Sequence, residues 1–212
     1  MPGTITALRV QKKNKQRVNV YLDGEFAFGL AGIEAAKLHR GQYLSDEDIA
    51  YLREQDTRET AYERALNFLS YRPRSEAEVR RYLQEKQVPL SVQDEVVARL
   101  TRAGLLDDHA FARYWVENRE RFKPRGVYAL RSEMRQKGLG DDVISAVLEE
   151  LDEEENAYRA AKQRAARWKQ LDYQSFRRKL GAYLRRRGFA FETIEAAIVR
   201  VWHELQAEGE HT

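Results

Sequence analysis

One pattern of apolar, basic and turn-forming residues occurs three times along this chain, at intervals of about 50 residues. The three aligned sets are Val79, Leu83, Lys86 and Val88; Leu130, Met134, Lys137 and Leu139; and Leu180, Leu184, Arg187 and Phe189. Every apolar position stays apolar in all three sets, and a cation always precedes the turn. A chain built in this way folds as tandem modules, each of which buries its own small core.

Each repeat is predicted to be a bundle of three helices. It opens with an alanine and an aromatic residue and closes with an amphipathic segment, and its apolar residues have helical spacing. A capping box at Ser75–Glu78 is expected to open the second helix of the first repeat. Gly138 and Gly188 lie where the second helices of the later repeats end, and Gln87 stands at that position in the first. Glycine there favours a left-handed helix cap.

The N-terminal segment has a different period. Residues 6–10 and 18–22 alternate apolar and polar side chains, as half-buried strands do. Asp23-Gly24 predicts a tight turn, and the apolar alternation then continues. We expect a three-stranded meander within roughly the first 30 residues. It is too small to be stable alone and should pack on a helix that begins after Ser45, with a possible break at Asp56-Thr57.

The predicted fold class is therefore mainly α, with three tandem three-helix repeats in an elongated array and a small N-terminal β-meander. The predicted domains are residues 1–58 for the meander and its helix, then 59–108, 109–155 and 156–212 for the three repeats.

Composition and missing motifs exclude several function classes. The chain has no cysteine, which excludes disulfides, thiolate metal sites and a cysteine nucleophile. No apolar run is long enough to span a membrane and no signal-peptide pattern is present, so a soluble intracellular protein is expected. Phosphate-binding glycine motifs and the zinc motif His-Glu-x-x-His are missing, and the four histidines are scattered. We expect no catalytic residues, no cofactor and no metal.

Two acidic stretches are interpreted structurally. Asp107-Asp108 has the composition of an acid–base pair, but it directly precedes a predicted helix, which favours an N-cap. The acidic run 149–155 has metal-binding side chains, yet a solvated helix face is the preferred interpretation.

Charge is strongly segregated although the formal net charge is only +3. Residues 156–188 contain eleven Lys or Arg and one acid, whereas residues 141–155 contain eight acids and no base. Two alternatives remain open. The two stretches are either solvated helix faces that pair with each other, or the basic stretch binds a polyanion or an acidic protein groove.

Basic side chains recur on the second helix of every repeat, and these are the candidate binding residues. They are Arg74, Arg80, Arg81 and Lys86 in the first repeat; Arg125, Arg131, Arg135 and Lys137 in the second; and Arg177, Arg178, Lys179, Arg185, Arg186 and Arg187 in the third. Interleaved acids balance the first two sets in one interpretation, and all three sets line a binding surface in the other. Arg186 and Arg187 are expected nearest the exposed side of their helix.

Several of these segments resemble one known family. Residues 72–83 are similar to the first-repeat signature of the RecX regulatory proteins, and residues 104–112 are similar to the junction that follows it. Pro124-Arg125-Gly126 with Gly138-Leu139 resembles the second-repeat pattern, and residues 183–189 resemble the third. The resemblance covers roughly residues 59–204, and residues 21–24 resemble an N-terminal extension of longer members. Leu139 departs from the isoleucine that is commoner there.

The resemblance implies a non-enzymatic, cytoplasmic, monomeric modulator of the RecA recombinase. Such proteins bind in the groove of the RecA–DNA filament and restrain its ATPase, strand-exchange and SOS co-protease activities, and some contact single- or double-stranded DNA. The residues alone also permit a helical-repeat protein that binds DNA independently of RecA. An enzyme with an unrecognised carboxylate site is the least favoured alternative.

Overall fold

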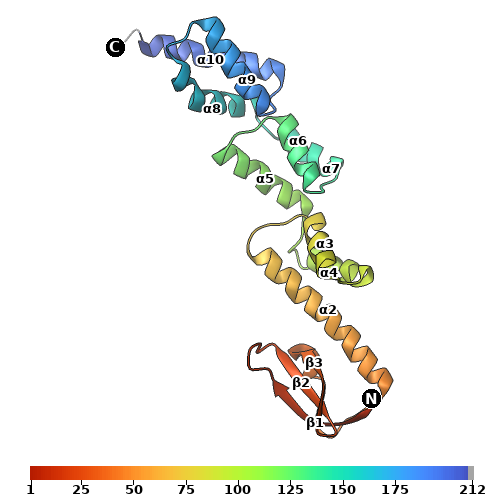
Figure 1. Cartoon of the computed structure of the whole chain (residues 1–212). Helices are drawn as coiled ribbons and strands as arrows, with labels where there is room; N and C mark the ends of the chain where they lie inside the picture. Colours follow the sequence, from red (N-terminus) through yellow and green to blue (C-terminus); the bar gives the residue numbers. More distant parts are fainter. Residues whose placement is uncertain (210–212) are drawn as a thin grey trace. The chain divides into compact units, whose positions relative to one another are not determined.

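The computed structural model describes residues 1–209 and divides them into two compact units. One unit consists of residues 1–72 and 79–106, and the other of residues 73–78 together with the chain from residue 107 onward. Helices dominate (Figure 1). In the described chain, no helix has an apolar stretch that would let it cross a membrane.

The N-terminal sheet has four antiparallel strands in the order β3-β2-β1-β4. Their bounds are Gly3–Val10 for β1, Arg17–Leu22 for β2, Glu25–Ala31 for β3 and Tyr43–Leu44 for β4. The predicted meander of three strands is confirmed, and the predicted limit at residue 30 is wrong because β4 pairs with the start of β1 after the short helix α1, Gly32–Ala35. The turn between β2 and β3 uses positive φ at Asp23 and Gly24.

The sheet packs on α2, Asp46–Ser70, which Ser45 opens with a full capping box. The predicted break at Asp56-Thr57 is wrong, because α2 is continuous and both side chains have partners. Thr57 Oγ1 donates to the carbonyl of Arg53, 2.9 Å away. The Asp56 carboxylate accepts from Arg17 at 2.8 Å and from the Ala31 amide at 2.6 Å. Of the two polar residues that indicated a break, Asp56 instead connects the sheet to the helix, and Thr57 bonds within α2.

Three three-helix bundles follow, as predicted. The first uses the later part of α2 with α3, Glu76–Glu85, and α4, Leu90–Arg102. The second consists of α5, Asp108–Phe122, α6, Val127–Gln136, and α7, Asp141–Glu149. The third consists of α8, Glu153–Ala165, the 3-10 turn Ala166–Trp168, α9, Tyr173–Arg186, and α10, Phe191–Gly209. The first apolar residue of each aligned set is completely buried in the core of its own bundle. These residues are Val79, Leu130 and Leu180.

Glycine ends the second helix of the later bundles in the predicted left-handed conformation. Gly138 has φ +82° and Gly188 has φ +81°, and Gln87 adopts φ +57° at the same position of the first bundle. A side chain in this region costs about 1 kcal/mol. Gln87 therefore adopts with strain a conformation that glycine adopts without it.

Gly188 also lies at a close contact between two helices of the second unit. The amide of Gly126 donates to the carbonyl of Arg187 at 3.0 Å, and the amide of Tyr128 donates to the carbonyl of Gly188 at 3.1 Å. A Cβ atom on Gly126 would lie 2.2 Å from the Gly188 oxygen. The start of α6 is thus hydrogen-bonded to the end of α9, and no side chain fits between them.

A related contact, made by a side chain in place of a backbone amide, occurs at the start of α3, whose first residues belong to the second unit. The hydroxyl of the buried Ser75 donates to the carbonyl of Lys137 at 2.6 Å, and a Cβ atom on Gly138 would lie 2.3 Å from Ala77 Cβ. The Glu78 amide donates to Ser75 Oγ at 3.2 Å, and the Glu78 carboxylate pairs with Lys137 at 2.9 Å. In the alignment of the repeats, Ser75 corresponds to Gly126 and Lys137 corresponds to Arg187.

We call each of these contacts between a helix start and a helix end a junction. At each junction an acid from the following bundle accepts a hydrogen bond from the helix start. The Asp108 carboxylate accepts from the Glu76 amide at 2.8 Å, and the Glu153 carboxylate accepts from the Val127 amide at 2.8 Å. Glu76 and Val127 are the first residues of α3 and α6, whose amides have no partner within the helix. Asp108 is half-buried, and this burial raises the pKa of its carboxyl.

The junction predicts a large effect of a single methyl group. Gly126→Ala should lower the melting temperature by about 5 °C or more, because overpacking against fixed backbone typically costs about 1–3 kcal/mol. Gly126 has φ −82°, a conformation open to alanine, so the effect would be steric. The measurement is thermal unfolding followed by circular dichroism.

Gly181→Ala is the matched control. Gly181 is also buried, but a Cβ atom there would meet Ile198 at 3.5 Å, an ordinary contact. Because alanine is favoured over glycine in a helix interior by about 1 kcal/mol, this variant should melt between the parent's temperature and about 4 °C above it. Equal melting temperatures for Gly126→Ala and Gly181→Ala would contradict the close contact.

Candidate polyanion-binding surface

Most candidate cations of the first two repeats have partners within the protein. Arg80 pairs with Asp94 at 2.6 Å, Arg125 pairs with Glu133 at 3.4 Å, and Arg131 donates to Ser145 at 3.2 Å. Arg135 pairs with Asp141 at 2.8 Å, and Lys137 pairs with Glu78 at 2.9 Å. Hydrogen bonding to Arg135 lowers the pKa of the Asp141 carboxyl. For the four that pair with carboxylates, Arg80, Arg125, Arg135 and Lys137, the structure supports the charge-balancing interpretation.

The three remaining candidates of the first repeat differ in exposure. Arg74 is partly buried. Arg81 is exposed, and Lys86 is exposed with its ammonium 5.6 Å from the centre of the Tyr82 ring. Of the four candidate binding residues in the first repeat, two are therefore exposed cations, Arg81 and Lys86.

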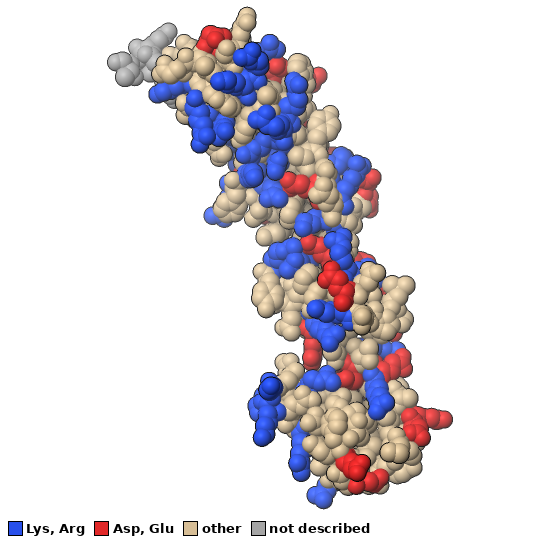
Figure 2. Space-filling model, viewed as in Figure 1, with Lys and Arg blue, Asp and Glu red and all other residues tan. Residues whose placement is uncertain are grey.

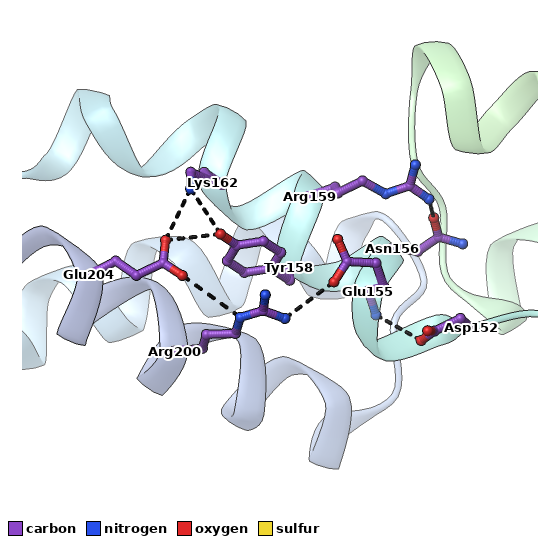
Figure 3. A network of polar contacts seen from close by, with 8 residues as sticks. All are labelled: Asp152, Glu155, Asn156, Tyr158, Arg159, Lys162, Arg200 and Glu204. Atoms are coloured by element: carbon purple, nitrogen blue, oxygen red, sulfur yellow. Dashed lines mark hydrogen bonds and ion pairs between the residues drawn. The ribbon is translucent and has the colours of Figure 1, made fainter.

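In the third repeat, a network of polar contacts neutralises Lys162 of α8 and Arg200 of α10 (Figure 3). Lys162 contacts Tyr158 Oη at 2.9 Å and Glu204 at 3.2 Å. Arg200 bridges Glu155 and Glu204 and lies over the Tyr158 ring. The pKa of Glu204 is lowered overall. Burial acts to raise it, but the hydrogen bonds from Tyr158 and Lys162 outweigh the effect of burial.

Asn156 extends this network toward α5. It is completely buried, donates to Glu120 at 3.0 Å and accepts from Arg159, which also pairs with Glu120 at 3.7 Å. Three of the eleven basic residues in the stretch 156–188 form an ion pair with an acid on another helix. Arg159 pairs with Glu120, Lys162 pairs with Glu204, and Arg177 pairs with Glu195 at 2.9 Å.

Arg187 is not on the exposed side of α9, contrary to the prediction. It is partly buried, donates to the Pro124 carbonyl at 3.0 Å and lies 5.0 Å from the centre of the Tyr183 ring. The physical reason is helical geometry. Arg187 follows Leu180 by seven residues, which returns it to within about 20° of that buried side chain. Arg187 is a junction residue.

Four cations of α9 remain exposed and have no ion pair or hydrogen bond to any described residue: Arg178, Lys179, Arg185 and Arg186. At 3.6 residues per turn they span an arc of about 120°, centred opposite Leu180 and Leu184. We call these four residues the α9 basic face. Figure 2 shows Lys and Arg gathered over the part of the chain formed by α8–α10, with few acids among them.

The repeat alignment explains why this face is unbalanced. Lys179 aligns with Glu78 and Ala129, and Arg186 aligns with Glu85 and Gln136. The third repeat has thus replaced acids and neutral residues with cations, without acquiring nearby acids. Such a face attracts polyanions because unpaired charges reinforce one another over several ångströms.

The acidic motifs serve the fold. Asp107 is the N-cap of α5 and accepts from the Ala110 amide at 3.0 Å, as predicted, and this hydrogen bond lowers its pKa. Within the run 149–155, the Glu153 carboxylate accepts from the Val127 amide, and the Glu155 carboxylate accepts from Arg200. No cluster of three His, Asp or Glu side chains suited to a metal occurs in residues 1–209.

Sequence reasoning missed the residues that surround an open groove between α9 and α10, among them Gly181 and Phe191. Neither belongs to a motif by itself. The signal lies in the repeat alignment, where Gly181 stands opposite two arginines, Arg80 and Arg131.

Family models match most of the chain. The RecX N-terminal domain model matches residues 3–45, and the models of the first, second and third RecX three-helix domains match residues 61–100, 107–148 and 152–198.

Named relatives and solved structures agree with these models. The Regulatory protein RecX of Bacillus subtilis is 33% identical over 97% of this chain and 80% of its own length. That of Leuconostoc mesenteroides is 34% identical over 97% of this chain and 79% of its own length. A crystal structure of regulatory protein RecX has a TM-score of 0.73 at 29% identity and covers 91% of this chain and 97% of its own. RecX from Lactobacillus salivarius, at 23% identity and a TM-score of 0.64, shares the fold over 69% of this chain and 97% of its own.

Arg187 and Arg186 are predicted to differ in their effect on stability. Arg187→Ala should destabilise the protein by about 1–2 kcal/mol, because the Pro124 carbonyl loses its donor. Arg186→Ala should stay within about 0.5 kcal/mol of the parent, because the side chain is exposed. Melting temperatures of the two variants provide the comparison.

Arg187→Lys serves as a further control. Lysine stands at the aligned position 137 and contacts the preceding helix there, so this variant should keep part of the lost stability. If Arg187→Ala and Arg186→Ala melt at the same temperature, Arg187 has no junction role.

Proposed function

The chain belongs to the RecX family of regulatory proteins, and from this premise we propose that it binds the RecA–DNA filament and lowers RecA activity. The observation that carries the proposal is the α9 basic face. Its four exposed cations have no partner among the described residues, whereas comparable cations of the first two repeats are largely neutralised. A filament of protein on DNA offers phosphates and carboxylates in a regular series, and both accept charge-assisted hydrogen bonds from arginine.

The tandem modules add to this proposal. Several weak contacts made by one chain raise the effective concentration of each remaining contact. Arg81 and Lys86 of the first repeat are exposed and are available for such additional contacts. Binding along the filament would restrain the RecA ATPase, strand exchange and SOS co-protease activities, in the cytoplasm and by a monomer that needs no cofactor.

The alternative function is DNA binding that is independent of RecA. It would use the same cations, because phosphates are their simplest partner. Salt and nucleotide dependence separate the two. Binding to bare duplex DNA falls steeply with salt, whereas filament binding requires RecA and its nucleotide.

The test is the ATPase activity of RecA from the same organism on single-stranded DNA, measured with increasing amounts of the protein. The parent should inhibit. Reversing two cations of the α9 basic face, Lys179→Glu with Arg186→Glu, should weaken inhibition several-fold while the melting temperature stays within about 2 °C of the parent.

The charge-matched control reverses Lys12 and Lys13, two exposed lysines of the loop between β1 and β2. It makes the same change in net charge and should inhibit like the parent. Equal inhibition by both double variants would show that the α9 basic face is only a solvated surface. Absence of inhibition by the parent would refute the proposed function itself.

A further inference from the structure

The first helix of the first two bundles ends in an exposed aromatic ring at the same position of the repeat. Tyr71 directly follows α2, and Phe122 is the last residue of α5. The two residues correspond in the alignment of the repeats, and each is followed by a cation and then by a proline. The exposed fraction is 84% for Tyr71 and 68% for Phe122, so most of each ring lies outside the core of its bundle.

Helical geometry explains why both rings face solvent. Each lies six residues after the last buried side chain of its helix, Ala65 in α2 and Val116 in α5. Six residues leave the ring about 120° away from that side chain around the helix. Among the described residues, Tyr71 has no side-chain hydrogen bond or ring contact, and the one cationic or aromatic contact of Phe122 is with Arg121, whose guanidinium lies 5.2 Å from the ring centre.

Folding gains little from rings in this position. The hydrophobic contribution to stability scales with the apolar area removed from water, and most of the area of each ring stays in water. A single exposed aromatic residue is common on a protein surface and needs no explanation. Two such rings at the same position of consecutive bundles indicate a contact outside the chain that both bundles make in the same way.

The third bundle has no ring at this position. The residue aligned with Phe122 is Asp172, the N-cap of α9, which accepts from the Ser175 amide at 3.0 Å. The aligned rings thus occur in the two bundles whose candidate cations are largely paired, and the α9 basic face occurs in the bundle without an aligned ring. The repeats present two different kinds of surface to a partner.

A single ring on each bundle suits insertion into a pocket of a folded protein. Aromatic side chains are common anchors of protein interfaces, where each fills one desolvated pocket. Single-stranded nucleic acid instead stacks successive bases on successive aromatic side chains. The residue after each ring is a cation, Arg72 or Lys123, so a complementary pocket has an acidic rim.

We propose that Tyr71 and Phe122 are equivalent anchors that insert into the same apolar, acid-rimmed pocket on separate protein subunits of the filament. This inference rests on the proposed function and deepens it, because it assigns contacts of the first two repeats to the protein of the filament and not to its DNA. Two equivalent anchors on one chain need a partner that repeats its binding site, and a filament does so.

The test is the affinity of the full-length protein for RecA filaments preformed on single-stranded DNA, measured by biolayer interferometry over a series of salt concentrations. The same single strand without RecA is measured in parallel. Tyr71→Ala and Phe122→Ala should each weaken filament binding by about fivefold or more. The double variant should weaken it by about the product of the two effects. Binding to the bare strand should stay unchanged.

The salt dependence separates these anchors from charged contacts. Removing an apolar ring removes no phosphate contact, so both alanine variants should keep the parent's slope of log K against log salt. Reversing Lys179 and Arg186 on the α9 basic face should instead make that slope shallower. Tyr71→Phe should bind filaments like the parent, because the second repeat has phenylalanine at the aligned position.

Tyr51→Ala is the matched control. Tyr51 is 60% exposed on α2 and lies before the first repeat, so this variant should bind filaments like the parent. All variants should melt within about 2 °C of the parent, because the changed side chains are exposed.

Three results would overturn the proposal and leave the proposed function standing, because in each of them the parent still binds filaments. They are unchanged filament binding by the Tyr71 and Phe122 double variant, equal losses of binding to the filament and to the bare strand, and a loss of the same size in Tyr51→Ala. Absence of filament binding by the parent would overturn both.

Discussion

The backbone contact between the start of one second helix and the end of the next is the interaction on which the other features of the second unit depend. At the α6–α9 junction, amides of residues 126 and 128 reach carbonyls of residues 187 and 188. Helix starts have free amides and helix ends have free carbonyls, so each end satisfies the other. Backbones can approach this closely only without side chains between them, which explains glycine at 126 and 188. It also explains the acids at 108 and 153, which accept the next free amide.

This constraint also determines how charge is distributed. The cation that precedes each turn, Lys137 or Arg187, contacts the neighbouring helix start and is withdrawn from the surface. Arginines on α3 and α6 cross to the third helix of their own bundle. What remains exposed and unpaired on α9 is the cation set that arose where the third repeat departs from the other two. The unpaired cations and the regular ion pairs thus lie in different repeats of one architecture.

Much of this fold follows from periodicity, because burial depends on which residues share one side of a helix. Val79, Leu130 and Leu180 are predicted core positions and are completely buried. The errors arise where long-range contacts override local signals. Asp56-Thr57 has the composition of a helix break, but Arg17 and Ala31 from the sheet satisfy the aspartate. The predicted exposure of Arg187 is wrong because the residue returns to the side of the helix that carries Leu180, where it contacts the Pro124 carbonyl. The groove at Gly181 is defined by a missing side chain.

Gln87 has a consequence for the number of modules. At the ends of α6 and α9, residues 138 and 188, a Cβ atom would lie within 2.5 Å of a Cβ atom at the start of the helix packed there, α3 or α6. Gln87 occupies the matching position of α3 and has a full side chain there, at the cost of a left-handed backbone. A helix start that packed on the end of α3 as α6 packs on α9 would meet the Gln87 side chain. Gln87 therefore disfavours a further helix start at the end of α3, whereas glycine admits one at the ends of α6 and α9.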